Sequence, residues 1–236
     1  MDSFQAPFQL KELVLDAVSL KEFQNSIGML THLEYLVLEG GGDPMRIEWK
    51  SFTKSLRNLS NLRRLVLCDF TTSSGQFSLS NSEIHVVSKP QMSNLQMTVI
   101  REGKYVSKVS ICGDYCPNLI SLHIEFMPNL TEVNVTLTKL NCIKLKDCPI
   151  LKRLWWSSID LEKISILNIM ECPQLEEIPS LAKLNYLERI TIDECGKLQS
   201  MTGIEEMGRL KCLHLSKVNG TLLNSIQMLQ VCISLL

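Results

Sequence analysis

The chain of 236 residues is poor in aromatic side chains and has no excess of either charge. Phe, Trp and Tyr make up 6% of the residues and apolar residues 45%, so the apolar content is mostly aliphatic. The 24 Lys and Arg residues are balanced by 25 Asp and Glu residues, which leaves a net charge of -1. Proteins that coat nucleic acid or an anionic membrane need a large basic excess, so we expect neither as a partner.

Segments that would direct the chain to a membrane or out of the cell are also missing. No uncharged apolar run reaches the length of about 18 residues that a transmembrane helix needs. The N-terminal segment MDSFQAPFQLKEL has neither the basic start nor the apolar stretch of a signal peptide. The nine cysteines are odd in number and scattered, which favours reduced thiols over a disulfide framework. These features predict a cytoplasmic location.

Motifs of catalytic and cofactor sites are absent as well. The run Gly40–Gly42 is followed by Asp43 and Pro44, which indicates a turn, and there is no G-x-x-x-x-G-K-[ST] motif for phosphates. Neither H-E-x-x-H nor G-x-S-x-G occurs. Cys112 and Cys116 have no second pair at the spacing of zinc ligands. The sequence therefore predicts no enzyme, no metal and no cofactor.

The feature that is present is a repeat of the pattern L-x-x-L-x-L, in which Ile or Val can replace Leu. The first positions of the pattern are Leu10, Leu33, Leu62, Leu119, Leu140, Ile164, Leu187 and Leu210. Apart from one gap, successive first positions are 21 to 29 residues apart. This is the period of a leucine-rich repeat, about 20–29 residues, and a globular core has no reason to keep it.

The physical reason for the repeat lies in the last two apolar positions, which alternate with polar ones as in a short strand. One turn of chain cannot bury its apolar face alone. Stacked turns form a buried ladder that contributes about 1.5–3 kcal/mol for each Leu or Ile. We therefore predict an α/β solenoid over residues 1–236. It would be a leucine-rich repeat horseshoe with a parallel concave sheet, about nine or ten repeats and short or irregular convex segments.

The second half of each repeat carries its own pattern. Apolar pairs that should line the convex side are Leu130 with Val133, Leu151 with Leu154, Leu175 with Ile178 and Leu198 with Met201. Trp155 and Trp156 follow Leu154, and adjacent positions of an extended chain cannot both point inward. We expect one tryptophan in the core and the other over the turn.

Position nine of three consecutive repeats is a cysteine, at Cys148, Cys172 and Cys195. These cysteines are 24 and 23 residues apart, which is the repeat step itself. The consensus repeat has a small Asn or Cys inside the turn at this place, so we predict that the three thiols are buried and structural.

These features give the segment from CPILKRLWW to CGKLQSM a resemblance to the repeats of plant intracellular immune receptors, the nucleotide-binding leucine-rich repeat proteins. The resemblance is carried by L-x-x-L-x-I-x-x-C-P-x-L-x-x-I-P and by N-S-I-x-x-L. It implies a non-catalytic protein-recognition domain, the ligand-sensing and autoinhibitory region of a disease resistance receptor. The implied partners are a pathogen effector or a host protein, together with other domains of a longer parent chain.

Two other functions remain open from the residues. Cysteine-type repeats also occur in F-box proteins, so the chain is alternatively the substrate-binding region of a ubiquitin-ligase adaptor. A free-standing repeat scaffold that self-associates through uncapped ends is the third interpretation, because solenoids need polar caps.

The repeat is irregular over residues 71–112 and at the C-terminus. Leu95, Thr98 and Ile100 fit a degenerate repeat, whereas TVIREGKYVSKVSI fits a hairpin insertion, and the sequence does not choose between them. Alignment of the two N-S-I words puts Cys232 and Leu235 at positions one and four of a last repeat. We therefore expect the C-terminal repeat to be truncated.

The outward strand positions of successive repeats should form columns on the concave face, where solenoids bind their partners. These columns mix apolar, acidic and basic residues. The acidic N-terminal part and the basic part at Lys144 and Lys146 would orient a partner by charge. The candidate protein-binding residues are Glu12, Asp16, Tyr35, Glu39, Arg64, His123, Glu125, Lys144, Lys146, Asn168, Met170, Arg189, Asp193 and His214.

Overall fold

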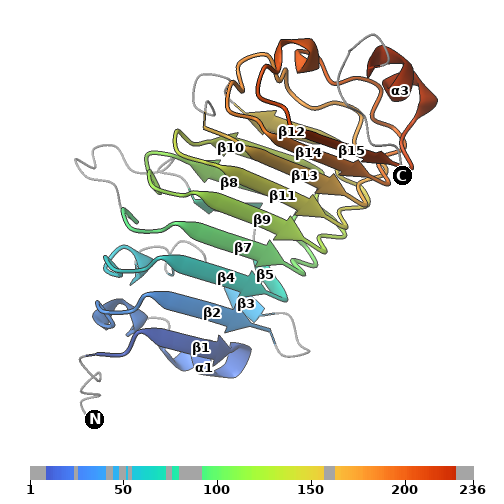
Figure 1. The fold of residues 1–236 in the computed structure, drawn as a ribbon. Helices are drawn as coiled ribbons and strands as arrows, with labels where there is room; N and C mark the ends of the chain where they lie inside the picture. Colours follow the sequence, from blue (N-terminus) through green and yellow to red (C-terminus); the bar gives the residue numbers. More distant parts are fainter. Residues whose placement is uncertain are drawn as a thin grey trace, which may run out of the picture.

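A computed structural model shows the chain winding into stacked turns that form an elongated, curved solenoid (Figure 1). It describes residues 9–23, 26–40, 45–47, 52, 55–72, 76–79, 92–156 and 163–226. Cys232 and Leu235, on which the prediction of a truncated last repeat rests, lie outside the described residues.

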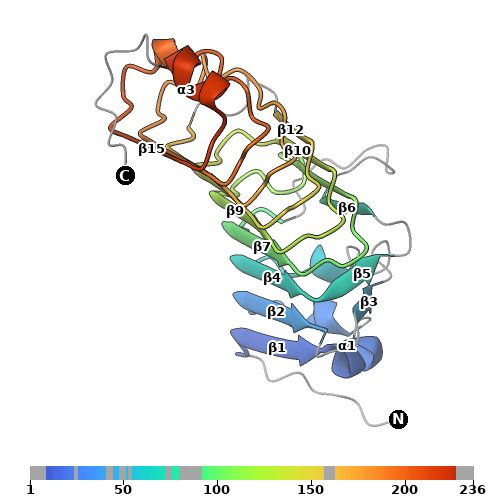
Figure 2. The same cartoon turned by 90° about the vertical axis from the view of Figure 1, so that its right-hand side faces the viewer.

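One face of the solenoid is a parallel sheet of nine strands that follow one another in chain order. Each strand is matched residue for residue with its neighbours, from the first residue to the fifth. The strands are β1 (Glu12–Asp16), β2 (Tyr35–Glu39), β4 (Arg64–Cys68), β7 (Met97–Arg101), β9 (Ser121–Glu125), β11 (Cys142–Lys146), β13 (Ile166–Met170), β14 (Arg189–Asp193) and β15 (Cys212–Ser216). Figure 2 shows this sheet on the concave side, which confirms the predicted parallel concave sheet.

The convex side is made of short segments, as predicted, and in the middle of the solenoid these are strands. Four of them, β6 (Gln76–Leu79), β8 (Lys108–Cys112), β10 (Glu132–Thr136) and β12 (Arg153–Trp156), form a second parallel sheet. Two more, β3 (Met45–Ile47) and β5 (Phe70–Thr72), form a small pair. Toward the two ends of the described chain the convex segments are α1 (Ala17–Phe23), α3 (Gly220–Ile226) and the 3-10 turns Ile27–Met29 and Ile204–Glu206.

The segment that breaks the sequence pattern contributes a strand to the main sheet. β7 pairs with β4 and β9, so that Thr98 lies between Leu65 and Leu122. β8 pairs instead with β6 and β10 in the convex sheet. Because β7 and β8 lie in different sheets, they are arranged as the two sides of a repeat turn rather than as a hairpin.

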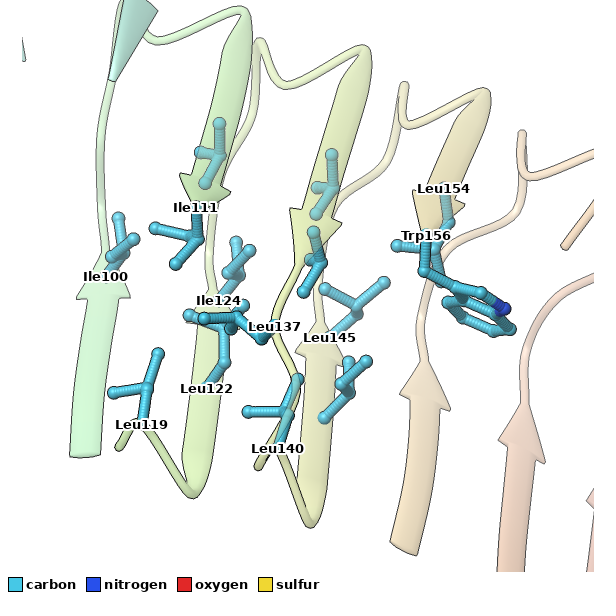
Figure 3. Close-up of a cluster of buried hydrophobic side chains, with 14 of the residues drawn as sticks. Ile100, Ile111, Leu119, Leu122, Ile124, Leu137, Leu140, Leu145, Leu154 and Trp156 are labelled. Atoms are coloured by element: carbon cyan, nitrogen blue, oxygen red, sulfur yellow. The ribbon is translucent and has the colours of Figure 1, made fainter. Parts of the chain in front are cut away.

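The core is a double ladder of aliphatic side chains between the two sides. The second and fourth residues of the main-sheet strands point inward, and from β2 to β14 they are fully buried. Side chains from the convex strands meet them, and Figure 3 shows Ile111, Leu154 and Trp156 across from this ladder. Trp156 is buried and Trp155 is 48% exposed, as the alternation of an extended strand requires.

The three repeated cysteines lie inside the turns, as predicted. Each is fully buried, and each thiol donates to the main-chain carbonyl of the residue two positions earlier: Cys148 to Lys146 (3.6 Å), Cys172 to Met170 (3.3 Å) and Cys195 to Asp193 (3.3 Å). Burial raises the pKa of Cys195 to about 12, so this side chain stays a thiol and serves as a weak donor.

The turn after the main-sheet strands has a recurring left-handed residue that is not glycine. Seven of the nine strands are followed by such a residue, for example Glu102 (φ 57°) and Phe126 (φ 55°). Its N–H donates to the last carbonyl of the next strand, as from Glu102 to Glu125 (3.1 Å). Gly40 takes this place after β2, where a Cβ atom would lie 2.0 Å from the Asp69 carbonyl oxygen. The hydrogen bonds of the sheet thus continue into the turn.

Thr98 is the one polar side chain among the fully buried ladder positions, and its hydroxyl has no hydrogen-bond partner in the described part of the chain. A buried hydroxyl without a partner costs about 1–3 kcal/mol. We expect Thr98→Val to raise the free energy of unfolding by about 1–2 kcal/mol, measured by urea denaturation. Thr191→Val, on the concave surface, is the matched control; an equal gain there would show that strand propensity is the cause.

Glu102 tests the cost of the left-handed turn, because its side chain is exposed and its backbone is held at φ 57°. A Cβ atom in this conformation costs about 1–2 kcal/mol. Glycine avoids this cost, but its greater conformational freedom in the unfolded chain offsets part of the gain in stability. We expect Glu102→Gly to be more stable than Glu102→Ala by about 1 kcal/mol in urea denaturation. Equal stability of the two variants would mean that the turn is not strained.

Candidate functional site

The concave face carries three columns of outward side chains, from the first, third and fifth residues of the nine strands. The strand register aligns these residues, so all of the predicted candidates lie on this one face. The first column holds Glu12, Tyr35, Arg64 and Arg189; the third-residue column holds His123, Lys144, Asn168 and His214; the fifth-residue column holds Asp16, Glu39, Glu125, Lys146, Met170 and Asp193.

The strand β7 adds three residues to these columns that the sequence columns left out. They are Met97, Val99 and Arg101, which align with Arg64, Val66 and Cys68 of β4. The signal that leads to them is the spacing of Leu95, which lies 24 residues before Leu119.

In the C-terminal half of the face, charged side chains are paired across neighbouring strands and turns. Lys144 lies 2.7 Å from the carboxylate of Glu125, and Lys146 lies 3.6 Å from that of Glu171. Lys146 also lies over the Phe126 ring, 5.6 Å from its centre. The predicted basic part at Lys144 and Lys146 is thus balanced by acids that contact it.

His123 lies at the centre of the face, half-buried, and its Nε2 atom is 3.0 Å from the Ser121 hydroxyl. Burial lowers the pKa of His123, and the nearby cations Lys144 and Arg64 add to this effect, whereas Glu125 opposes it. The imidazole is therefore neutral near pH 7 and offers one donor and one acceptor.

The N-terminal half of the face has an apolar central column. Val14, Val37, Val66 and Val99 occupy the third position of β1, β2, β4 and β7, where the five following strands have only polar side chains. Val14 is 62% exposed, whereas Val66 and Val99 are 6% and 7% exposed.

The face offers hydrogen bonds, charges and apolar contacts for recognition, and no metal centre is found in it. Within the described residues, no three or more His, Cys, Asp and Glu side chains gather in a way that would hold a metal ion. None of the helices in the described part is long and apolar enough to cross a membrane.

Comparison with known proteins finds a curated relative. No family model matches the chain. A protein of Arabidopsis thaliana described as a probable disease resistance protein is 25% identical over 217 residues. The match covers 84% of this chain, and the chain spans 28% of the length of that relative.

Comparison of structures identifies the fold. The leucine-rich repeat domain of the type III effector XopL matches 87% of this chain and 76% of its own, with a TM-score of 0.51 and 16% identity. An internalin of Listeria monocytogenes matches 96% of this chain and 88% of its own at 17% identity. Its TM-score of 0.26 is too low to support a conclusion about the fold. The chain is thus a leucine-rich repeat solenoid that resembles a region of a plant disease resistance protein.

The environment of His123 predicts how stability depends on pH. The pKa of His123 is lowered from its usual value of 6.5 in the folded state. At pH values between the folded pKa and 6.5, the unfolded chain therefore binds more protons than the folded chain. We expect the free energy of unfolding to fall as the pH is lowered from 7 to 5, and His123→Gln to reduce this fall. Urea denaturation at several pH values measures it. His32→Gln, at an exposed histidine, is the control; an equal effect of both substitutions would contradict the assignment.

Proposed function

We propose that this leucine-rich repeat domain, which resembles a region of a plant disease resistance protein, is the ligand-sensing and autoinhibitory repeat region of a plant immune receptor. It would bind a pathogen effector or a host protein on its concave face, without catalysis, and would contact other domains of a longer parent chain. A cytoplasmic location is part of this proposal. The observation that carries it is the set of three chemically mixed columns held in register on a nine-stranded sheet.

The rigidity of this surface favours protein recognition. Every strand that carries column residues is hydrogen-bonded to both neighbouring strands, except the two edge strands of the described sheet. A preorganised surface loses little conformational entropy when a partner binds. The relative favours the immune function over the F-box alternative, because it is described as a disease resistance protein.

Site-specific crosslinking in plant cells tests the proposal. A photoreactive amino acid is placed at Val37 or Asn168 on the concave face, and at Asn134 of β10 as the matched convex control. We expect protein adducts from at least one concave position and none from Asn134, with an effector or a host defence protein in the adduct. Adducts from the convex position alone, or from none of the three, would contradict recognition by the concave face. A concave adduct that is a ubiquitin-ligase substrate would instead support the F-box alternative.

A further inference from the structure

We propose that the basic edge, made of Lys139, Lys163, Tyr186 and Arg209, is a binding surface for a short acidic segment of a partner protein. It lies outside the concave columns, on the edge of the main sheet from which the strands start (the tails of the arrows in Figure 1). Each of its residues stands three positions before the first residue of a strand, in the consecutive turns of β11, β13, β14 and β15. The inference goes beyond the proposed function, because it adds a second surface and names the chemistry of its ligand.

In three earlier turns the same position holds an asparagine that ties neighbouring turns together. These asparagines precede β4, β7 and β9, and each side-chain amide donates to a main-chain carbonyl of the turn before it: Asn61 to Thr31 (2.8 Å), Asn94 to Ser60 (2.7 Å) and Asn118 to Ser93 (2.5 Å). Within the described chain, no side chain of the basic edge makes such a bond. The stacking of the turns therefore does not depend on these four side chains.

Charged side chains at equivalent positions of neighbouring turns elsewhere alternate in sign. Lys11 and Arg63 both pair with Glu34, which lies in the turn between them, at 3.0 and 3.7 Å. On the convex sheet, Lys108 pairs with Glu132 of the next strand at 2.8 Å. Like charges on neighbouring strands are destabilising, which explains the alternation.

The basic edge breaks this alternation. Lys139 and Lys163 occupy the same position in the adjacent turns of β11 and β13, and both are exposed. Neither forms an ion pair with a described residue; Lys139 donates only to the neutral side-chain oxygen of Asn118 (2.6 Å). A ligand that brings carboxylates to this edge would supply the missing opposite charge.

Tyr186 holds the third cation of the edge in place. Its side chain is 47% exposed, and the guanidinium of Arg209 lies 4.5 Å from the centre of its ring. Stacking on a ring leaves the N–H groups of an arginine free to bind a carboxylate. Acids near it along the chain do not take this place among the described residues: Glu206 forms no ion pair with Arg209, and Glu188 pairs with Lys211 (3.0 Å). Tyr and Arg are also the residues that contribute most to protein interfaces.

The amount of charge favours an acidic protein segment over a nucleic acid. Neighbouring strands lie about 4.8 Å apart, so the edge from Lys139 to Arg209 spans about 14 Å and offers three cations. A surface for nucleic acid contacts many phosphates and needs a large basic excess, whereas the whole chain has a net charge of -1. A few carboxylates on a short segment match three cations and one exposed tyrosine.

A labelled acidic peptide provides the probe. It alternates glutamate and serine over about eight residues, and a second peptide has glutamine in place of glutamate. At about 50 mM salt, we expect the first peptide to bind the full chain in fluorescence anisotropy and the second to bind at least about tenfold more weakly. Binding of the first should weaken at about 200 mM salt, because salt screens exposed charges. A single-stranded oligonucleotide of equal charge is the third probe, and it should bind more weakly than the acidic peptide.

Charge-reversal variants on the two edges of the sheet locate the binding. We expect Lys163→Glu and Arg209→Glu each to weaken binding of the acidic peptide about tenfold. Lys197→Glu makes the same charge change at an exposed lysine in the turn that follows β14, on the opposite edge, and should change binding less than about twofold. Lys163→Arg should keep the binding.

Two variants of Tyr186 test its part in holding Arg209. Tyr186→Ser removes the ring and should weaken binding severalfold, whereas Tyr186→Phe keeps the ring and should bind as the unchanged chain does. Thermal unfolding should be unchanged in both, because the side chain is exposed.

Absence of binding, equal binding of the glutamine peptide, or equal loss with Lys197→Glu would overturn the basic edge as the binding surface. Tighter binding of the oligonucleotide would overturn the protein segment as its ligand. Each of these results would leave the proposed function untouched, because crosslinks from Val37 and Asn168 decide recognition by the concave face separately.

Discussion

Stacking of successive turns at the spacing of β-strands is the constraint on which the rest of this structure depends. A single turn buries no core, so each inward position must be filled by a side chain that packs against its equivalents in the two neighbouring turns. This explains why Leu and Ile fill nearly every inward position and why Thr98 is the exception in the described ladder. It also explains the cysteines, since the inside of a turn has room for a small side chain only.

The same constraint governs the polar side chains, because residues in one column lie about 4.8 Å apart on neighbouring strands. Like charges at that distance repel, and the convex sheet avoids this by alternation: Lys108, Glu132 and Arg153 follow one another, and Glu177 pairs with Arg153 beyond them. The C-terminal half of the concave face is balanced in a similar way by the pairs of Lys144 and Lys146. In the N-terminal half, Glu39 and Glu102 lie close enough to attract the guanidinium of Arg101.

The frame of the solenoid could be predicted from the sequence because two simple periods carry it, the alternation within a strand and the step between repeats. Together they assigned the outward columns, and the register confirms that alignment. The strand β7 was harder to predict, because Thr98 stands where the L-x-x-L-x-L pattern has its second leucine. The convex strands could not be predicted, since an L-x-x-L pair suits a strand, a helix or a turn equally. The ion pairs depend on side-chain directions that no spacing encodes.

Separation of the inward and outward positions lets such a fold change its binding surface without changing its core. The separation is incomplete at β4 and β7, where Val66, Val99 and Cys68 face outward and are nevertheless buried. Because these side chains are already shielded from water, a ligand gains little area from them directly. Arg101 interacts there with the Cys68 thiol, and the carboxylates of Glu102 and Glu39 also attract its guanidinium. Part of the outer face is therefore packed by the protein's own side chains, and only the remaining outward positions are open to a partner.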